Sequence, residues 1–245
     1  MKAMILAAGL GTRLRPLTDT TPKALVRVNG HTLLSHVTSI LEQAGFDSFV
    51  VNVHHLADQI VAYLDNNPEL GAKFEVSREE QLLDTGGGIR HARPYLEGCG
   101  HFLVHNVDIF SNLDIPRMVA SAPEDALSTL LVSERKTSRY LLFDDSLRLV
   151  GWTNVDTGEV KSPFGQIDPS NYRRLAFGGI HFLSDKVFCL MENWPEKFSI
   201  IDFYLQNAKN HPVYAYVQDD LKLIDVGKAS VLDQVSVFLK ELGLD

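Results

Sequence analysis

The sequence predicts an α/β fold built on an open, mostly parallel sheet flanked by helices. Three short apolar runs, at residues 3–8, 49–53 and 74–76, have the length of buried strands, and the segments between them show helical periodicity. Strands that alternate with helices at this spacing form parallel sheets, because each crossover to a parallel neighbour takes a dozen or more residues. Ligands bind such sheets at the carboxyl ends of the strands, so the residues after each run are candidates for a site.

The first half of the chain contains the regular alternation. Thr32 is a suitable helix N-cap, and Gly45 stands where a helix usually ends. Asn66-Asn67-Pro68 stops the next helical segment. In chain order, we expect strands at 3–8 and 24–28, a helix at 33–45, a strand at 49–53, a helix at 56–64 and a strand at 74–76.

The second half is richer in β-structure. The glycine triplet 86–88 is poor for any regular element, so we expect a loop there and a helix only from Ile89 to Leu96. Residues 140–152 resemble a β-meander, and residues 153–173 are expected to be irregular. Further strands are expected at 102–108, 126–132, 175–182 and 213–217, and helices at 115–122, within 182–190, from 198 onward and at 230–242.

The composition describes a soluble, acidic globular protein. The 245 residues are 45% hydrophobic and 22% charged, with a net charge of -8. An excess of acid argues against a general nucleic-acid surface, although one local basic cluster is enough for a single nucleotide. Cys99 and Cys189 match no metal-binding spacing, and the sequence shows no membrane span and no signal peptide. We therefore expect one cytoplasmic domain without nucleic-acid or membrane partners, of open oligomeric state.

The first apolar run ends in a segment suited to polyphosphate. Gly9 and Gly11 lack a Cβ, so the backbone can turn sharply, and successive N–H groups in such a turn attract anions. Arg13, Arg15 and Lys23 add three positive charges close behind. A dinucleotide fingerprint would need a third glycine here, and a P-loop would need Gly-Lys-Ser/Thr. Taken alone, a Gly-x-Gly pair is also compatible with an ordinary tight turn.

The longer string from Gly9 to Lys23 resembles the signature of sugar-1-phosphate nucleotidyltransferases. These enzymes make nucleotide-sugars from a nucleoside triphosphate and a sugar 1-phosphate and release pyrophosphate. The resemblance implies that the glycine-rich loop and Arg13 hold the triphosphate and that Lys23 contacts phosphate. It also implies a Rossmann-like, glycosyltransferase-A-like sheet with a small β-rich sugar-binding insertion. Residues 1–245 would form one nucleotidyltransferase domain, with a nucleotide-binding half at about 1–135 and a sugar-phosphate-binding half at about 136–245.

A second segment, from Leu83 to Gly88, resembles a Glu-Thr-Gly-Gly-Gly string of the uridylyltransferases that activate N-acetylmuramate 1-phosphate. Mannose-1-phosphate guanylyltransferase-like proteins have similar segments. The resemblance implies contacts with base and ribose, whereas composition alone would also allow a flexible surface loop. The implied nucleotide-binding residues are Ala7, Ala8, Gly9, Gly11, Thr12, Arg13, Asn52, Glu79, Thr85, Gly86, Gly87 and Asn106.

Two aspartates, Asp108 and Asp225, are the implied Mg²⁺ ligands. Triphosphate chemistry uses Mg²⁺ to neutralise charge, and Mg²⁺ binds carboxylate and phosphate oxygens. The first aspartate lies in a string like the family's Asn-Gly-Asp, but Val107 replaces the glycine. The second lies in a string like Trp-x-Asp-Val-Gly, but Leu223 replaces the tryptophan. Outside this resemblance, an acid after a strand is usually a helix N-cap or loop residue.

The implied sugar-phosphate contacts are Lys23, Phe177, Gly179 and Asp202. The strand around Gly179 resembles the family's strand beside the sugar. Many relatives also have a Val-Glu-Lys-Pro motif that grips the sugar phosphate, and this sequence has none. The basic segment 134–139 is interpreted as a solvated loop, with Lys136 or Arg139 over the site as the alternative.

The resemblance implies an enzyme with Arg13, Lys23 and Asp108 as catalytic residues. Its favoured substrates are UTP and N-acetylmuramate 1-phosphate, which would place it in cell-wall recycling. The alternative within the family is a GTP-dependent mannose- or heptose-1-phosphate guanylyltransferase. An alternative of another class is a regulatory protein that binds nucleotide-sugar without turnover. A dinucleotide-dependent oxidoreductase is disfavoured, because Asn52 stands where its second strand would end in an acid.

Overall fold

A computed structural model describes residues 1–244, and its main feature is a ten-stranded sheet. The strand order is β11-β10-β9-β12-β6-β1-β4-β5, extended by β8 beside β12 and by β13 beside β8. The strands are β1 (Lys2–Leu6), β4 (Ser48–Val53), β5 (Phe74–Arg78), β6 (His101–Asn106), β8 (Ser128–Ser133), β9 (Arg139–Phe143), β10 (Leu149–Asn154), β11 (Glu159–Lys161), β12 (Arg173–Ser184) and β13 (Val213–Val217).

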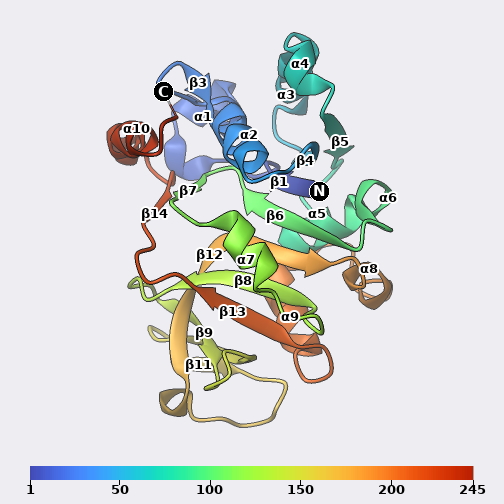
Figure 1. Ribbon diagram of the computed structural model, residues 1–245, viewed down its shortest axis with the longest axis vertical. Helices are drawn as coiled ribbons and strands as arrows, with labels where there is room; N and C mark the ends of the chain where they lie inside the picture. The colour runs from blue at the N-terminus through green and yellow to red at the C-terminus, as the bar shows by residue number, and fades with distance from the viewer. Residues whose placement is uncertain (245) are drawn as a thin grey trace.

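The part of the sheet around β1 is parallel. β1 pairs in parallel with β4 and β6, and β4 pairs in parallel with β5. Ala3 and Ile5 belong to one apolar core and Met4 to another, so β1 is buried on both faces. Such burial explains why this strand is a continuous apolar run. Figure 1 shows α2 (Leu33–Gln43) and α3 (Ala57–Asp65) beside these strands at the top of the view, and the predicted α/β class is confirmed.

The sheet continues as an antiparallel extension. β12 pairs antiparallel with β6, β8 and β9, and β9, β10 and β11 form successive antiparallel pairs. Figure 1 shows β9 and β11 at the bottom of the view, at the far end from α2. The predicted meander is present. The expectation that residues 153–173 are irregular is wrong for β11, whose short strand is held by pairing with β10.

The last part of the chain returns to the first half. β14 (Leu223–Asp225) pairs antiparallel with β7 (Ile109–Ser111), and α10 (Leu232–Glu241) follows near the N-terminal elements in Figure 1. There Asn29 Nδ2 donates to the carbonyl of Ser236 at 3.1 Å. The proposed division into a nucleotide half and a sugar-phosphate half stays a prediction.

Two local expectations are wrong. The glycine triplet lies inside α5 (Asp84–His91), and the strand expected at 24–28 is instead a 3-10 turn over Lys23–Leu25 followed by β2 (Arg27–Val28). The remaining elements are β3 (His31–Thr32) and α1 (Leu17–Thr20), α4 (Pro68–Gly71), α6 (Arg93–Leu96), α7 (Ile115–Ala120), α8 (Val187–Leu190) and α9 (Ile200–Asn207). Among residues 1–244, none of the helices combines the length and apolar character needed to cross a membrane.

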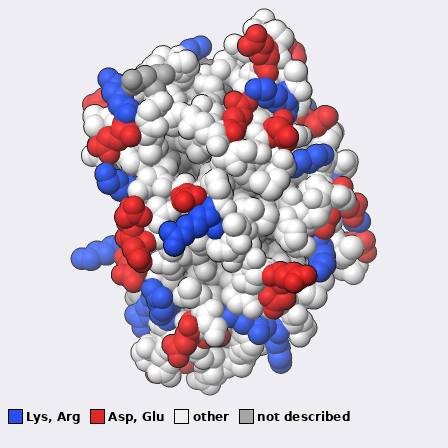
Figure 2. Space-filling model, viewed as in Figure 1, with Lys and Arg blue, Asp and Glu red and all other residues white. Residues whose placement is uncertain are grey.

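Charges are mixed on the face seen in Figure 2. Acidic and basic side chains are interspersed there, and no continuous basic surface covers this face. That pattern agrees with the net charge of -8.

Candidate active site

A cavity of about 510 Å³ lies where β1, β4 and β6 end. This is the edge at which ligands bind in parallel α/β sheets. Most of the residues expected to bind nucleotide lie in its wall. They are Ala7, Ala8, Gly9, Gly11, Thr12, Arg13, Asn52, Glu79, Thr85 and Asn106. Lys23, expected to contact the sugar phosphate, and Asp108, expected to bind metal, lie in the same wall.

The loop after β1 has a defined shape at Gly11. This residue has φ +62°, a left-handed conformation that glycine adopts without strain. Thr18 Oγ1 donates to the Gly11 carbonyl at 2.7 Å, and an added Cβ would lie only 2.8 Å from Thr18 Cγ2. The short turn Thr12–Leu14 starts directly afterwards and presents Arg13 to the cavity.

Two cations pair with the two expected metal ligands. Lys23 Nζ forms a partly buried ion pair with Asp108, whose side chain is 19% exposed. Arg13 Nη2 lies 3.7 Å from Asp225 Oδ2, at a more exposed position. Gly227 allows this approach, because a Cβ there would lie 2.6 Å from Arg13 Nη1. Arg13, Lys23, Asp108 and Asp225 thus form a charged cluster of two ion pairs. The first three line the cavity, whereas Asp225 lies outside its wall and is linked to it through Arg13.

The two aspartates have the donor chemistry that Mg²⁺ requires. Asp225 pairs with Ile109, and Val226 N donates to the Asp108 carbonyl at 2.8 Å, so the carboxylates come from adjoining backbone. Asp225 Oδ1 is buried and has no hydrogen-bond partner. Within residues 1–244, no group of three or more His, Cys, Asp or Glu side chains forms a complete protein site. Two carboxylates completed by phosphate fit Mg²⁺, which seldom occupies an all-protein cage.

Val107 fits its position despite replacing the family's glycine. Its side chain is buried in the larger apolar core, and its N–H donates to the Leu6 carbonyl at 3.1 Å. Leu223 packs, partly buried, against the same core. Both replacements are accommodated by packing.

Asn52 and Glu79 connect the phosphate loop with the start of α5. Both side chains are buried. Asn52 Oδ1 accepts from Ala7 N at 2.8 Å, and its Nδ2 donates to Glu79 Oε1 at 2.7 Å. Glu79 Oε2 accepts from Leu83 N at 3.1 Å. These contacts assign both residues a role in positioning the cavity wall.

The glycine triplet packs against another segment of the protein. Gly86 and Gly87 are buried and lie outside the wall of the first cavity, and their expected contact with nucleotide stays a prediction. A Cβ on Gly86 would overlap the ring of Phe198, and one on Gly87 would overlap the carbonyl of Glu196. Gly86 N donates to the Phe198 carbonyl at 2.9 Å. The absence of side chains therefore lets α5 pack tightly against the segment before α9.

A second cavity, of about 710 Å³, adjoins the first. The two share Leu6, Asp84, Thr85 and Asn106 in their walls. Phe177 and Asp202, expected to contact sugar phosphate, lie in the second wall, and Gly179 does not. A Cβ on Gly179 would lie 2.9 Å from Asn106 Nδ2, so the lack of a side chain at position 179 leaves room for the Asn106 side chain.

Basic residues of the second cavity come from three positions. Arg135, Arg139 and Lys161 line it. Lys161 Nζ lies 3.3 Å from Asp202 Oδ1 and 5.2 Å from the centre of the Trp152 ring. Arg139 therefore lines this cavity. This agrees with the alternative interpretation of segment 134–139, in which Lys136 or Arg139 lies over the site. Lys136 lies outside the wall.

Two histidines are buried, and one of them, His181, lines the second cavity. Burial lowers the pKa of His105 to about 4 and that of His181 to about 3. His181 Nδ1 and the Tyr204 hydroxyl are hydrogen-bonded, and burial raises the pKa of that tyrosine. Both imidazoles are therefore neutral at pH 7 and act as polar packing groups.

Sequence reasoning missed several residues of the walls. Lys197 lines the first cavity, Lys161 and Arg135 line the second, and Asp84 lines both. Lys161 could have been found as the cation of Glu159-Val160-Lys161, which lies on a short strand of the extension. No feature of the sequence indicated Lys197, because this residue reaches the cavity only through the packing of its segment on α5.

Comparison with known proteins gives a family and several relatives. The model of the nucleotidyl transferase family matches residues 2–146. The chain is similar to N-acetylmuramate alpha-1-phosphate uridylyltransferase of Caulobacter vibrioides, with 48% identity over 109 residues, covering 43% of this chain and 45% of the relative. It is similar to the protein of that name from Neisseria meningitidis, with 42% identity over 55% of this chain and 59% of the relative. The chain thus spans about half the length of these two curated relatives.

Another relative aligns with nearly the whole chain. It is 28% identical to D-glycero-alpha-D-manno-heptose 1-phosphate guanylyltransferase of Campylobacter jejuni, over 93% of this chain and 95% of the relative. Among solved structures, HddC from Yersinia pseudotuberculosis complexed with GMP-PN has a TM-score of 0.75 and 23% identity, over 97% of this chain and 99% of that chain. A UDP-glucose pyrophosphorylase complexed with UDP-glucose has a TM-score of 0.77 and 17% identity, over 98% of both chains. At these identities, the two structures support the fold.

Proposed function

We propose, from the premise that this chain belongs to the nucleotidyl transferase family, that it transfers a nucleotidyl group from a nucleoside triphosphate to a sugar 1-phosphate and releases pyrophosphate. The observation that carries the proposal is the junction of two cavities. One wall contains the phosphate loop with Arg13 and Lys23, and the other is lined by a basic extension of the sheet. Leu6 and Asn106 lie in both walls, where two substrates would meet.

The reaction joins two phosphates, so the residues act by alignment and charge. A sugar-phosphate oxygen attacks the α-phosphorus, a new P–O bond forms, and the bond to pyrophosphate breaks. The attacking phosphate is already ionised at neutral pH, so no general base is needed. Holding both phosphates in line and neutralising their charge lowers the barrier.

Each motif residue has a role in this proposal. Arg13 and the N–H groups of Gly11 and Thr12 bind the β- and γ-phosphates. Lys23 leaves its pair with Asp108 to contact the α-phosphate and the incoming phosphate. Asp108 and Asp225 would hold Mg²⁺, which would supply positive charge at the phosphate oxygens.

The favoured substrates are UTP and N-acetylmuramate 1-phosphate. The relatives at 48% and 42% identity carry the name of that uridylyltransferase and support this choice. The second cavity adds a chemical reason, because Arg135 and Arg139 offer two guanidinium groups there. One can bind the sugar phosphate and the other a carboxylate on an acidic sugar. Under this proposal the enzyme serves the recycling of a cell-wall sugar.

A GTP-dependent heptose-1-phosphate guanylyltransferase is the second candidate. It is favoured by the Campylobacter relative, whose similarity extends over 93% of this chain. Because an uncharged heptose needs one anion site only, this candidate leaves one arginine of the second cavity without a partner on the sugar.

A substrate panel tests the proposal. Pyrophosphate release would be measured with Mg²⁺ and each of UTP, GTP, CTP and dTTP, with N-acetylmuramate 1-phosphate or a heptose 1-phosphate as acceptor. We expect release with UTP and the acidic sugar. Release with GTP and heptose phosphate would move the chain to the second candidate. Binding of nucleotide-sugar with no release from any pair would favour a non-catalytic binding protein.

A further inference from the structure

Asp84 lies at the junction of the two cavities. It is exposed, and it lines both walls together with Leu6, Thr85 and Asn106. Asp84 is the charged member of these four. A carboxylate at this place is unexpected, because two phosphate groups are to meet nearby and both are negative.

The backbone of Asp84 is held in an uncommon conformation. Its φ is +61°, in the left-handed region that glycine adopts more easily than aspartate. The residues on either side are fixed. Leu83 donates from N to Glu79 Oε2 at 3.1 Å and accepts at its carbonyl from Phe198 N at 3.2 Å, and Thr85 Oγ1 accepts from Ile200 N at 3.0 Å. Strain that the surroundings maintain in this way often marks functional positions.

The carboxylate has one oxygen directed to its own chain. Asp84 Oδ1 accepts from Thr85 N at 2.6 Å, as expected of an acid in the first turn of a helix. This contact accounts for one oxygen and orients the group. The other oxygen can accept from a ligand, and a fixed carboxylate forms strong, charge-assisted hydrogen bonds with hydroxyl donors.

We propose that Asp84 is a specificity-determining residue that accepts a hydrogen bond from a hydroxyl group of a substrate. This inference rests on the proposed function. The hydroxyl belongs either to the ribose of the nucleotide or to the ring of the sugar 1-phosphate, since both rings flank the reacting phosphates. The same negative charge repels the anionic groups, which directs phosphate toward Arg13 and any sugar carboxylate toward Arg135 or Arg139.

Two variants separate charge from backbone shape. Asp84→Asn keeps an acceptor for Thr85 N and tolerates positive φ, but it loses the charge. Asp84→Gly removes the side chain and relaxes the backbone, so its Tm should not fall below that of the wild type. Asp145→Asn is the matched control, because it removes one negative charge from an exposed turn outside both cavities.

Equilibrium binding in the presence of Mg²⁺ is the readout. The ligands are UTP, its 2′-deoxy and 3′-deoxy analogues, UDP and UDP-N-acetylmuramate. We expect Asp84→Asn and Asp84→Gly to weaken binding of UTP or of UDP-N-acetylmuramate by about tenfold or more, and Asp145→Asn to leave both unchanged. If ribose is the donor, a deoxy analogue binds the wild type as weakly as UTP binds the variants. If the acceptor sugar is the donor, UTP binding is unchanged and UDP-N-acetylmuramate loses affinity relative to UDP.

Binding within twofold of the wild type for all ligands in both variants would overturn the role of Asp84. A wild-type protein that binds these ligands but releases no pyrophosphate would instead overturn the proposed function and leave the binding comparison decisive for Asp84. A wild-type protein that binds none of these uridine ligands would overturn UTP and N-acetylmuramate 1-phosphate as the substrates, and with them the role of Asp84 stated here.

Discussion

Asn52 shows how a single buried side chain can hold two parts of a site. The residue is 3% exposed, its Oδ1 accepts from Ala7 N on the phosphate loop, and its Nδ2 donates to Glu79 Oε1. A polar residue at the carboxyl end of a strand could be predicted to face the site. Its actual partners could not, because Ala7 and Glu79 are distant from it in sequence.

Replacement of Asn52 by alanine should weaken both the fold and the site. Ala7 N and one oxygen of Glu79 would lose their partners in a buried place, and an unsatisfied buried group costs about 1–3 kcal/mol. We expect the free energy of unfolding in urea to fall by about that amount and the KM for the nucleotide to rise. Asn67→Ala, which removes an exposed amide, should change neither quantity. Unchanged stability in Asn52→Ala would contradict the connecting role.

The two buried histidines make stability depend on pH. An unfolded histidine takes up a proton near pH 6.5, whereas folded His105 and His181 remain neutral down to about pH 4 and about pH 3. The unfolded state therefore binds more protons below pH 6.5, and stability falls as pH decreases. Each histidine should cost about 1.4 kcal/mol between pH 7.5 and pH 5.5.

Urea unfolding at these two pH values measures the effect. His181→Gln should reduce the difference in unfolding free energy by about 1.4 kcal/mol relative to the wild type. His101→Gln, which removes a histidine from an exposed position, is the control substitution. A difference that is the same in the wild type and in His181→Gln would show that this histidine is protonated in the folded state.

At the scale of elements, α5 shows where local sequence and tertiary packing disagree. Three consecutive glycines predict a loop, because glycine is the weakest helix former after proline. The helix forms nevertheless, since Gly86 and Gly87 allow contact with the segment 196–198 that no larger residue could make. The helix was thus unpredictable from propensity, whereas the strand–helix alternation of β1, α2 and β4 followed directly from apolar periodicity.

Alanine substitutions in α5 distinguish packing from propensity. Propensity alone predicts that Gly87→Ala stabilises the protein by about 0.8–1 kcal/mol. The structure predicts the opposite sign, because the new Cβ would overlap the Glu196 carbonyl. We expect a lower Tm for Gly87→Ala and for Gly86→Ala. Gly9→Ala is the control for stability, because an added Cβ meets no atom within 4 Å there. A higher Tm for Gly87→Ala would show that α5 is less tightly packed.

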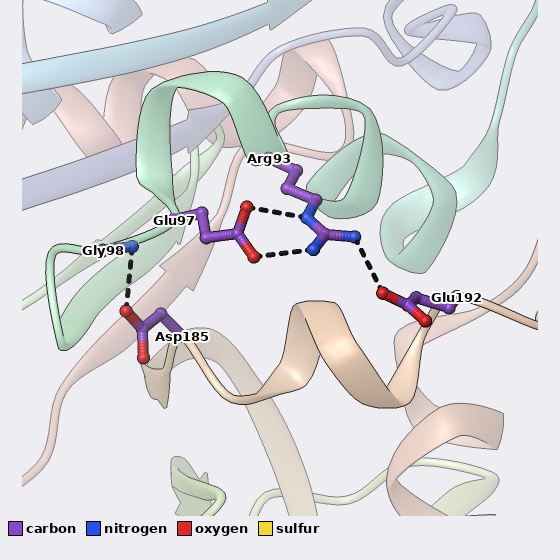
Figure 3. Close-up of polar contacts among 5 residues, drawn as sticks. All are labelled: Arg93, Glu97, Gly98, Asp185 and Glu192. Carbon is purple, nitrogen blue, oxygen red and sulfur yellow. Dashed lines mark hydrogen bonds and ion pairs between the residues drawn. The ribbon is translucent and has the colours of Figure 1, made fainter.

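At the scale of the whole molecule, the sheet and a few long-range contacts hold the two cavities together. Figure 3 shows one such contact outside both cavities, where Arg93 on α6 pairs with Glu97 and with Glu192 after α8. Asp185 accepts from Gly98 N at 3.0 Å in the same region. The hydrogen bond from Arg93 lowers the pKa of Glu97 and raises its own pKa. These groups are exposed, so their ion pairs orient the segments more than they stabilise the fold.

Much of the nucleotide site could be predicted from the sequence, whereas less of the second cavity could. Gly9 to Lys23, Asp108 and Asp225 lie in motifs whose residues are contiguous or end a strand, so their grouping followed from the fold. Arg135, Lys161 and Asp84 reach their places through the antiparallel extension and the packing of α5 on 196–198. No local pattern encodes those contacts, because each joins segments far apart in the chain.

The most direct measurement of the central claim is pyrophosphate release by Arg13→Ala and Asp108→Asn in the substrate pair that the wild type turns over. Each substitution removes a preorganised charge from the cluster formed by Arg13, Lys23, Asp108 and Asp225. We predict that both variants stay folded, as judged by circular dichroism, and that turnover falls about a hundredfold or more. Asp145→Asn should retain wild-type turnover. Near-wild-type rates in both site variants would contradict the assignment of this cluster as the catalytic centre.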